Sequence, residues 1–336
     1  MHLDLMDLLV CPACQGSLAL DGARDAEAEI ESGTLRCQAC AGRYPIVRFV
    51  PRFVPADNYS SSFGLQWNRF RRTQLDSATG QPITARRFFD QSGWAPRDLA
   101  GRWTLDVGCG AGRFAEVALG AGARLVAVDY STAVDACREN LGPHPRVDVI
   151  QADVYRLPFR RQRFAYVYCF GVLQHTPDVH ASFAALAAQL APGARLAVDL
   201  YPRIALNALW PKYWLRPVTT RIPPARLFPL VGRMVDALWP VSLALGRVPG
   251  VGRRLRHALP VANYEGLLPL TSAQLKEWAV LDTFDMLAPM HDHPQTVETL
   301  QAWFDEAGIE HAEVFRHGLV VGRGRKPGLP AAAGSG

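Results

Sequence analysis

A glycine-rich stretch, LDVGCGAGRF at residues 105–114, constrains the fold of this chain more than any other feature. It overlaps a short apolar run at 103–107, which we expect to form a buried strand, and residues from Phe114 to Leu119 continue at helical spacing. The glycines therefore occupy the turn between a strand and a helix, where the lack of a Cβ atom lets the backbone approach a ligand closely.

The spacing of these glycines and the acid before them indicate the kind of ligand. Gly108, Gly110 and Gly112 alternate with other residues. The dinucleotide fingerprint G-x-G-x-x-G would place its third glycine at Arg113 instead. Asp106 would repel a pyrophosphate, but its carboxylate accepts hydrogen bonds from an ammonium group. A cationic amino-acid ligand therefore fits the turn better than NAD.

Residues 106–112 resemble motif I of class I S-adenosylmethionine (SAM) dependent methyltransferases, in which this loop cradles the methionine part of SAM. Asp129 ends the second predicted strand at the spacing of a carboxylate that binds two ribose hydroxyls. Asp153 ends the third strand, where similar enzymes bind the adenine amino group. The resemblance implies SAM as the cofactor, and the residues assigned to it are Trp67, Asp106, Gly108, Gly110, Gly112, Asp129, Tyr130, Asp153, Val154 and Phe170.

Two C-x-x-C pairs near the N-terminus predict a metal site. Cys11, Cys14, Cys37 and Cys40 can present four thiolates tetrahedrally to a structural Zn²⁺, with disulfides or a redox pair as the alternatives. A module of this size has a small core, and structural zinc supplies about 10–16 kcal/mol of folding free energy. The stretch resembles the small zinc-ribbon activator subunit of tRNA and release-factor methyltransferases, here fused in the same chain.

The expected fold is α/β, a Rossmann-like seven-stranded doubly wound sheet with an antiparallel last strand. A chain of 336 residues with 49% hydrophobic composition can bury a large core in more than one domain. Cys109, Cys137 and Cys169 fall on separate predicted core elements, and we interpret them as core packing in a reducing compartment. The expected parts are a zinc ribbon (1–50), a helical linker covering the SAM pocket (51–100), a SAM-binding core (101–200), a basic aromatic insertion or lid (201–262), the rest of the core (263–325) and a disordered tail (326–336).

The linker contains candidate residues for a cover over the cofactor. Phe63, Trp67 and Phe70 recur at helical spacing, and similar enzymes place a helix before motif I over the SAM pocket. Tyr59 and Gln66 join Phe63 and Trp67 as candidates. The alternative is that these side chains only pack on the core.

A histidine follows the predicted fourth strand, which we place within residues 164–178. Active groups of open α/β sheets lie at the carboxyl ends of strands, so His175 is expected near the transferred methyl group. The loop lacks the N-P-P-Y pattern of enzymes that methylate amide or exocyclic nitrogens, and Cys169 lacks the preceding proline of cytosine C5 enzymes. His175 is therefore a candidate base for a hydroxyl acceptor, with local hydrogen bonding as the alternative.

Residues 201–262 carry an unusual concentration of positive charge. Against one acid, Asp236, the segment has ten basic residues: Arg203, Lys212, Arg216, Arg221, Arg226, Arg233, Arg247, Arg253, Arg254 and Arg256. Nine prolines predict short helices rather than one long one. We expect either docking on anionic phosphates of a membrane or lipid-linked acceptor, or a lid whose aromatic side chains pack inward.

The last part of the chain is expected to complete the sheet. We predict a helix over 272–279, a loop, a helix over 297–307, and strands at 310–315 and 319–324. The loop resembles the substrate-facing loop of sugar and small-molecule methyltransferases, and it holds Asp282, Asp285, His291, Asp292 and His293. His291 is the second catalytic candidate. His291 and His293 also resemble a pair of metal ligands, but no third ligand follows at a spacing typical of a metal site.

The expected function is SAM-dependent methyl transfer to a hydroxyl of a small or lipid-linked metabolite. One alternative is an RNA or ribosome-associated methyltransferase, because clustered Lys and Arg bind phosphate backbones. Another is a non-catalytic scaffold that binds SAM or a partner. No uncharged apolar run spans a bilayer and residues 1–10 include no basic n-region, so we expect cytoplasmic residence with peripheral contact at the inner membrane face.

Overall fold

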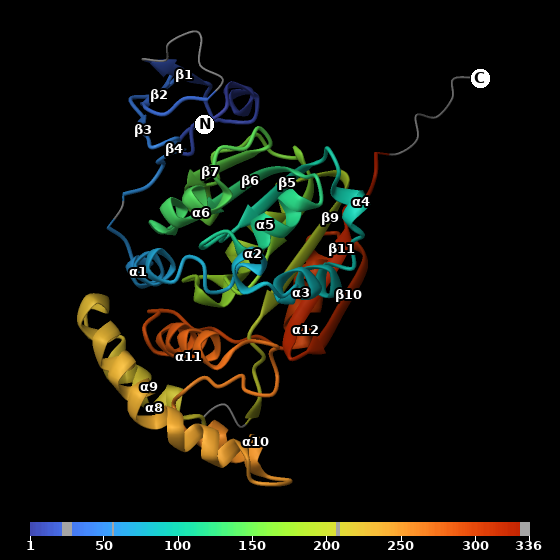
Figure 1. Cartoon of the computed structure of the whole chain (residues 1–336). Helices are drawn as coiled ribbons and strands as arrows, with labels where there is room; N and C mark the ends of the chain where they lie inside the picture. Colours follow the sequence, from blue (N-terminus) through green and yellow to red (C-terminus); the bar gives the residue numbers. More distant parts are fainter. Residues whose placement is uncertain (22–28, 56, 206–208, 330–336) are drawn as a thin grey trace.

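The computed structural model describes residues 1–21, 29–55, 57–205 and 209–329, apart from the side chains of residues 253, 254 and 257. Two sheets form the framework, with the zinc ribbon at one end and the basic insertion at the opposite end (Figure 1). The ribbon sheet is antiparallel, in the order of its strands β1 (Leu18–Asp21), β2 (Gly33–Cys37), β3 (Arg43–Val47) and β4 (Val50–Pro51).

The large sheet has seven strands in the order β10-β11-β9-β8-β5-β6-β7. Strands β5 to β9 pair in parallel, whereas β11 is antiparallel to both β9 and β10. This confirms the predicted seven-stranded sheet with an antiparallel last strand. The strands are β5 (Trp103–Val107), β6 (Arg124–Asp129), β7 (Val147–Gln151), β8 (Phe164–Cys169), β9 (Leu190–Leu200), β10 (Glu310–His317) and β11 (Leu319–Arg325).

Helices cover the sheet. They are α1 (Ser61–Arg69), α2 (Asp76–Thr79), α3 (Ile83–Ser92), α4 (Pro96–Leu99), α5 (Arg113–Gly120), α6 (Ala133–Leu141), α7 (Val179–Ala187) and α12 (Val297–Glu306), with short 3₁₀ turns at Leu3–Asp7, Val154–Arg156, Leu173–His175 and Arg256–Ala258. The fourth strand, β8, ends at Cys169 because Gly171 adopts a left-handed φ of 75° and a 3₁₀ turn follows.

The ribbon joins the large sheet at its β7 edge. Arg52 forms a parallel bridge with Gln151, and the Phe53 N–H donates to the Gln151 carbonyl at 2.8 Å. Leu9 bridges Phe159, and both are buried in one apolar cluster that the ribbon shares with the core. The ribbon is therefore packed as part of the core rather than tethered by a linker.

The insertion corrects the prediction of short helices. It contains α8 (Pro211–Thr219), α9 (Pro224–Gly246) and α10 (Gly252–Leu255). Helix α9 runs for 23 residues through Pro229 and Pro240. Each proline removes one backbone donor, but burial of Leu227, Val231 and Val235 against α11 outweighs that loss.

Helix α11 (Ser272–Leu287) is twice as long as the predicted helix over 272–279. Thr271 caps it by accepting from the Gln274 N–H, and the buried face continues through Leu281, Phe284 and Leu287. Asp282 and Asp285 therefore lie on a helix, where the sequence interpretation had placed them in a loop. The expected tail at 326–336 lies outside the described residues from 330 on, and the Lys326 N–H donates to the Ala194 carbonyl at 2.8 Å.

Candidate functional site

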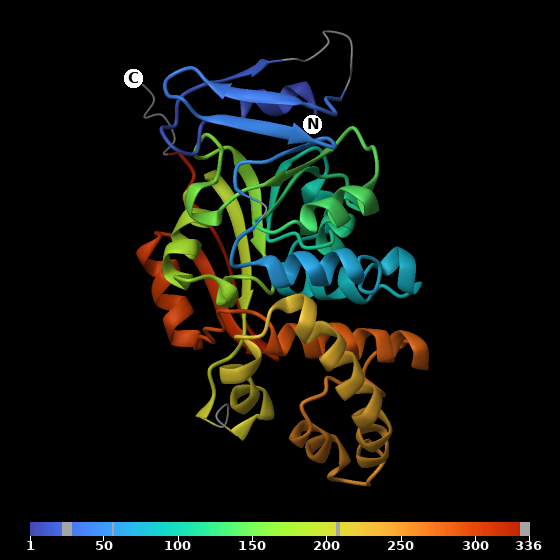
Figure 2. The same cartoon turned by 90° about the vertical axis from the view of Figure 1, so that its left-hand side faces the viewer.

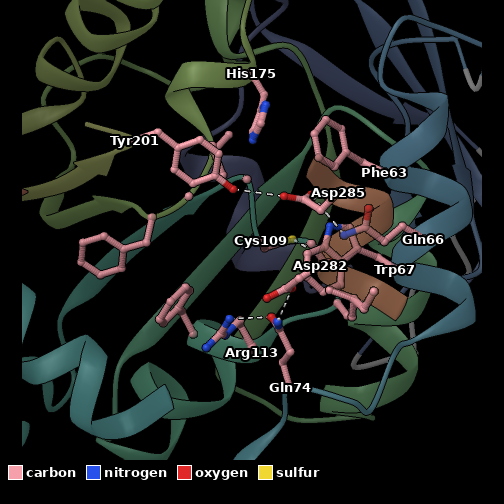
Figure 3. A pocket seen from close by; sticks show the side chains of 18 of the residues that line it. Phe63, Gln66, Trp67, Gln74, Cys109, Arg113, His175, Tyr201, Asp282 and Asp285 are labelled. Atoms are coloured by element: carbon pink, nitrogen blue, oxygen red, sulfur yellow. Dashed lines mark hydrogen bonds between the residues drawn. The ribbon is translucent and has the colours of Figure 1, made fainter. Parts of the chain in front are cut away.

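A cavity of about 550 Å³ opens at the carboxyl ends of β5, β6 and β8 and is lined from the other side by residues of α1, α8 and α11 (Figure 3). Figure 2 shows the chain from a second side, with the insertion and α11 below the large sheet. Crevices at this edge of an open α/β sheet are the usual ligand sites. The predicted site residues that line it are Trp67, Gly108, Gly110, Asp129, Tyr130, Val154, Phe170 and His175, whereas Asp106, Gly112, Asp153 and His291 do not reach its wall.

The glycine turn approaches the cavity closely. Gly108 has φ 81°, and a Cβ atom there would lie 2.3 Å from a methyl carbon of Val172. A Cβ atom on Gly110 would lie 3.2 Å from the indole of Trp67, so the α1 residue that we predicted as a cover does pack over the loop. Larger residues would close this space.

Two carboxylates stand behind and beside the turn. Asp129 accepts from the Gly110 N–H at 2.9 Å through Oδ2, and from the Ser131 N–H at 2.8 Å through Oδ1. Burial raises the pKa of Asp129 and raises that of Asp106 well above its usual value. Asp106 lies behind the turn without reaching the cavity wall, and the Tyr168 hydroxyl is the polar group that acts on its carboxyl.

The predicted adenine end is lined by aromatic and small side chains. Val154 and Tyr130 line the cavity, and the Tyr59 ring lies 4.9 Å from that of Tyr130. Asp153 accepts from the Tyr155 N–H at 3.0 Å and so caps the 3₁₀ turn that positions Val154. Its predicted contact with an adenine amino group stays a prediction.

His175 has a defined tautomer. Its Nδ1 lies 2.9 Å from the His291 carbonyl oxygen, and because a carbonyl only accepts, Nδ1 carries the hydrogen in this bond. In the neutral ring Nε2 then holds a lone pair, and this buried atom has no partner among the residues described. Phe63 and Tyr201 hold the imidazole, with ring centroids at 5.2 and 5.4 Å.

His291 therefore meets the site through its backbone. Its ring lies 5.4 Å from that of Tyr59 and 5.6 Å from that of His293, and burial lowers its pKa. The His291 carbonyl fixes the orientation of the His175 ring, its own side chain is not among the residues that line the cavity, and the catalytic role predicted for that side chain stays a prediction.

The cavity wall on α11 carries a polar network around Asp282 and Asp285, two residues that the sequence interpretation had assigned to a substrate-facing loop. Asp282 accepts from Gln74 at 3.2 Å, from Tyr264 at 2.5 Å and from Trp278 at 3.0 Å. Burial raises the pKa of Asp282 to about 6. The spacing of Trp278, Asp282 and Asp285 by three and four residues was the available signal, because it is helical.

The same helix carries Asp285, which binds the opposite part of the wall. Gln66 Nε2 donates to its Oδ1 at 3.2 Å, and the Tyr201 hydroxyl donates to its Oδ2 at 3.1 Å. In Figure 3, Phe63, Gln66, His175, Tyr201 and Asp285 surround one part of the cavity, and Gln74, Arg113 and Asp282 surround another.

The insertion turns part of its charge inward. Lys212 lines the cavity, and its Nζ lies 3.0 Å from Asp292 Oδ2, with both side chains less than a tenth exposed. Arg216 donates to the carbonyls of Met286 and Pro289. Arg256 is also buried, and the side chains of Arg253 and Arg254 lie outside the description. The positive charge of residues 201–262 is therefore only partly on the surface.

The four predicted zinc ligands converge. Their Sγ atoms all lie within 4.8 Å of one another, with 3.8 Å between Cys11 and Cys40 and 3.4 Å between Cys14 and Cys37. Tetrahedral Zn²⁺ with Zn–S bonds of about 2.3 Å separates its sulfurs by about 3.8 Å, so the group fits structural zinc. Over the described ranges, no other group of three His, Cys, Asp or Glu side chains gathers in this way. The pair His291 and His293 therefore has no third ligand there.

Comparisons with known proteins agree with these two sites. Residues 105–198 match the family described as methyltransferase domain, and residues 2–48 match the family described as Trm112p-like protein. The match over 105–198 contains the glycine turn, Asp129, Asp153 and His175.

Three curated relatives cover parts of the chain. An uncharacterized protein of Synechococcus is 26% identical over 61% of this chain and 46% of its own length. A tRNA U34 carboxymethyltransferase of Klebsiella pneumoniae is 36% identical over 30% of this chain and 32% of its own length. A ubiquinone biosynthesis O-methyltransferase of Coxiella burnetii is 31% identical over 29% of this chain and 43% of its own length. The chain thus spans less than half the length of these relatives.

Solved structures that match the chain include one from Methanococcus maripaludis that is described as a SAM-dependent methyltransferase, at 13% identity and a TM-score of 0.45 over 83% of this chain and 98% of that one. A complex of the Trm112 activator and a methyltransferase of Haloferax volcanii matches at 12% identity and a TM-score of 0.45, over 79% of this chain and 97% of that one. By its two sequence families and its sites, the chain joins a Trm112p-like zinc-ribbon domain to a methyltransferase domain of the SAM-dependent class.

Proposed function

We propose that this protein transfers a methyl group from SAM to a hydroxyl group of a small or lipid-linked acceptor. The observation that carries the proposal is the state of His175: a buried imidazole in the cavity whose Nδ1 donates to a fixed carbonyl, which leaves Nε2 free to accept a proton. A hydroxyl needs such a base when it becomes a nucleophile, since its own pKa is high.

Bound SAM supplies an electrophilic methyl group on a sulfonium, and the chain's residues bind and orient the reactants around it. The turn at 108–112 holds the methionine part, Asp129 accepts from the ribose hydroxyls, and Tyr130, Val154 and Phe170 enclose the adenine and ribose. Asp106 and Asp153 stand behind these contacts without lining the cavity. His175 takes the proton of the acceptor hydroxyl at Nε2, and its bond to the His291 carbonyl stabilises the charged ring.

Calorimetric titration with SAM tests the cofactor part. Asp129→Ala is expected to weaken binding by about 1.5–3 kcal/mol, because hydrogen bonds to a charged group are lost. An unchanged dissociation constant would remove Asp129 from the ribose site, and the absence of SAM binding by the wild-type protein would overturn the function.

Extracts incubated with SAM labelled in its methyl group test the acceptor part. Label recovered in hydroxyl groups of small or lipid-soluble metabolites supports the proposal, whereas label in RNA favours the alternative in which the exposed arginines bind phosphate backbones. Once the acceptor is known, His175→Gln should lower turnover while leaving SAM affinity nearly unchanged. Equal losses in both would place His175 in cofactor binding instead.

A surface at the mouth of the cavity favours a lipid-soluble acceptor. Helix α8 has the reverse of the usual distribution of polar and apolar side chains. Its Lys212 and Arg216 point inward, while Trp214 and Val218 are 65% and 63% exposed. Trp210, one turn before Trp214, is 41% exposed and lines the cavity. Trp210 therefore joins the exposed apolar side of α8 to the cavity, which suits an acceptor delivered from a membrane.

The outer side of α9 has the charge that an anionic bilayer attracts. Arg226, Arg233 and Arg247 are exposed there beside Leu230 and Val241, which are 50% and 46% exposed. Each basic residue near an anionic surface contributes about 1 kcal/mol. By length and composition α9 is apolar enough to cross a membrane, but its buried side packs on α11, so we propose docking on the surface.

Co-sedimentation with liposomes tests this docking and, with it, the proposed peripheral location at the inner membrane face. Binding should rise with the phosphatidylglycerol content and weaken as salt increases from about 0.05 to 0.5 M. Protein that stays in the supernatant with anionic and neutral vesicles alike would leave α8 and α9 as a lid only.

A further inference from the structure

A second buried acceptor atom in the cavity lacks a partner, and it belongs to a glutamine to which the proposed reaction gives no role. Gln66 lies on α1, has no exposed surface and lines the cavity. Its Nε2 donates to Asp285, but its Oε1 has no hydrogen-bond partner in the part of the chain that the structure describes. A buried amide oxygen left without a donor is costly, so such an atom indicates a ligand contact.

The orientation of this amide is determined by its neighbours. Asp285 is a carboxylate that only accepts, and its second oxygen already accepts from the Tyr201 hydroxyl at 3.1 Å. Gln66 must therefore turn its NH₂ group to Asp285, which leaves Oε1 as an acceptor at a fixed position.

Gln74 provides an internal comparison. It also lines the cavity, and its Nε2 also donates to a carboxylate of α11, Asp282 Oδ1, at 3.2 Å. Its Oε1, however, accepts from Arg113 at 2.5 Å. Two glutamines thus bind α11 in the same way, and only one of them, Gln66, keeps an acceptor for a ligand.

The two free hydrogen-bond acceptors, Gln66 Oε1 and His175 Nε2, belong to the same part of the cavity. Phe63 precedes Gln66 by one helical turn and its ring lies 5.2 Å from that of His175. Tyr201 connects the two from the other side, because its ring packs edge-on against His175 and its hydroxyl shares Asp285 with Gln66. Figure 3 shows these side chains around one space.

We propose that the acceptor is a ring that carries two neighbouring hydroxyl groups, with Gln66 as the residue that selects the second one. This inference rests on the proposed function. One hydroxyl gives its proton to His175 Nε2 while its oxygen forms the bond to the methyl carbon, and the carbon–sulfur bond breaks with its electron pair on sulfur. The other hydroxyl keeps its proton and donates it to Gln66 Oε1, and the flat faces of Phe63 and Tyr201 suit an aromatic ring.

The test compares butylcatechol with butylphenol by calorimetric titration into protein saturated with S-adenosylhomocysteine. The wild-type protein should bind butylcatechol about tenfold more tightly, because a site built to bind a hydroxyl rejects an analogue that lacks it. Gln66→Met removes the acceptor at nearly the same volume and should bring the ratio close to one. The matched control Gln74→Met should keep the preference.

Each result decides the inference. Equal affinity for the two compounds, or no binding of either, by the wild-type protein overturns it without any variant. A Gln66→Met protein that loses S-adenosylhomocysteine affinity and keeps the catechol preference would assign the amide to the cofactor and overturn it as well. Failure of the wild-type protein to bind S-adenosylhomocysteine is a separate result, since it contradicts the proposed function itself.

Discussion

The zinc ribbon and the basic insertion lie at opposite ends of the molecule and are attached in opposite ways. The ribbon places apolar residues such as Leu9 in the common core and joins β7 through the main chain at Gln151. The insertion places charges inside, with Lys212 on Asp292, and leaves Trp214 exposed. The ribbon is thus built to remain bound to its own chain, whereas the insertion presents a surface to something else.

This difference also distinguishes what each end contributes to function. The ribbon contacts the edge of the sheet at Gln151, which stands next to Ala152 of the cavity wall, but none of the described ribbon residues lines the cavity itself. The insertion supplies Trp210, Lys212 and Tyr213 to the cavity wall. We therefore expect ribbon changes to act on stability, and insertion changes to act on the acceptor and on surface binding.

The largest effect is expected from removing the metal. Structural zinc supplies about 10–16 kcal/mol in small domains, so Cys37→Ser or a strong chelator should unfold the ribbon and expose its share of the common core. Metal analysis should give one zinc per chain, and limited proteolysis should cut the ribbon of the treated protein first. Well under one equivalent of metal, with all seven thiols free, would contradict the site.

A smaller loss is expected from breaking the inward ion pair of the insertion. Lys212→Met leaves the buried Asp292 with only Arg216, whose Nε lies 3.9 Å from its Oδ2, and removing one partner of a buried pair costs up to about 3–5 kcal/mol. The double variant Lys212→Met with Asp292→Leu should recover most of this, since a packed apolar pair avoids the desolvation penalty. Denaturant unfolding measures the free energy of unfolding of both variants. Equal stability of the single and the double variant would show that the two residues are not coupled.

Removing surface charge should weaken binding to anionic liposomes by about 2 kcal/mol at the insertion and much less at the ribbon. Arg226→Gln with Arg233→Gln removes two exposed cations of α9 and should weaken binding to anionic liposomes by roughly thirtyfold. The matched control is Arg36→Gln with Arg43→Gln, two exposed arginines of the ribbon. Equal weakening by both pairs would mean that binding follows net charge and that α9 is not the docking surface.

The smallest effect concerns the contact of the ribbon with the core at His2. Its Nδ1 lies 3.2 Å from Asp148 Oδ1, and this hydrogen bond raises the pKa of His2. The stabilisation is complete below the unfolded value of about 6.5 and is lost as pH rises through the higher folded value. The stability gap between wild type and His2→Gln, under about 1 kcal/mol, should close between about pH 6 and pH 8. A constant gap would mean that the contact is not ionic.

Local patterns in the sequence were sufficient for much of the architecture. The glycine turn, the order of the strands and the four cysteines each depend on residues close together in the chain, and the sheet and the Cys cluster confirm them. The lengths of α9 and α11 were wrong because prolines and acids inside a helix are tolerated when the opposite face is buried, which local propensity does not report.

What the sequence determined by itself was therefore the identity of the two domains and the side of the sheet where the cavity opens, because strand, turn and helix signals are local. Only the tertiary structure decided which polar atoms face each other across that cavity. Gln66 and Asp285 are 219 positions apart, and His175 meets the His291 carbonyl across 116. Hydrogen-bond partners at such separations are chosen by packing, and so the free acceptors of Gln66 and His175 appear only in the folded chain.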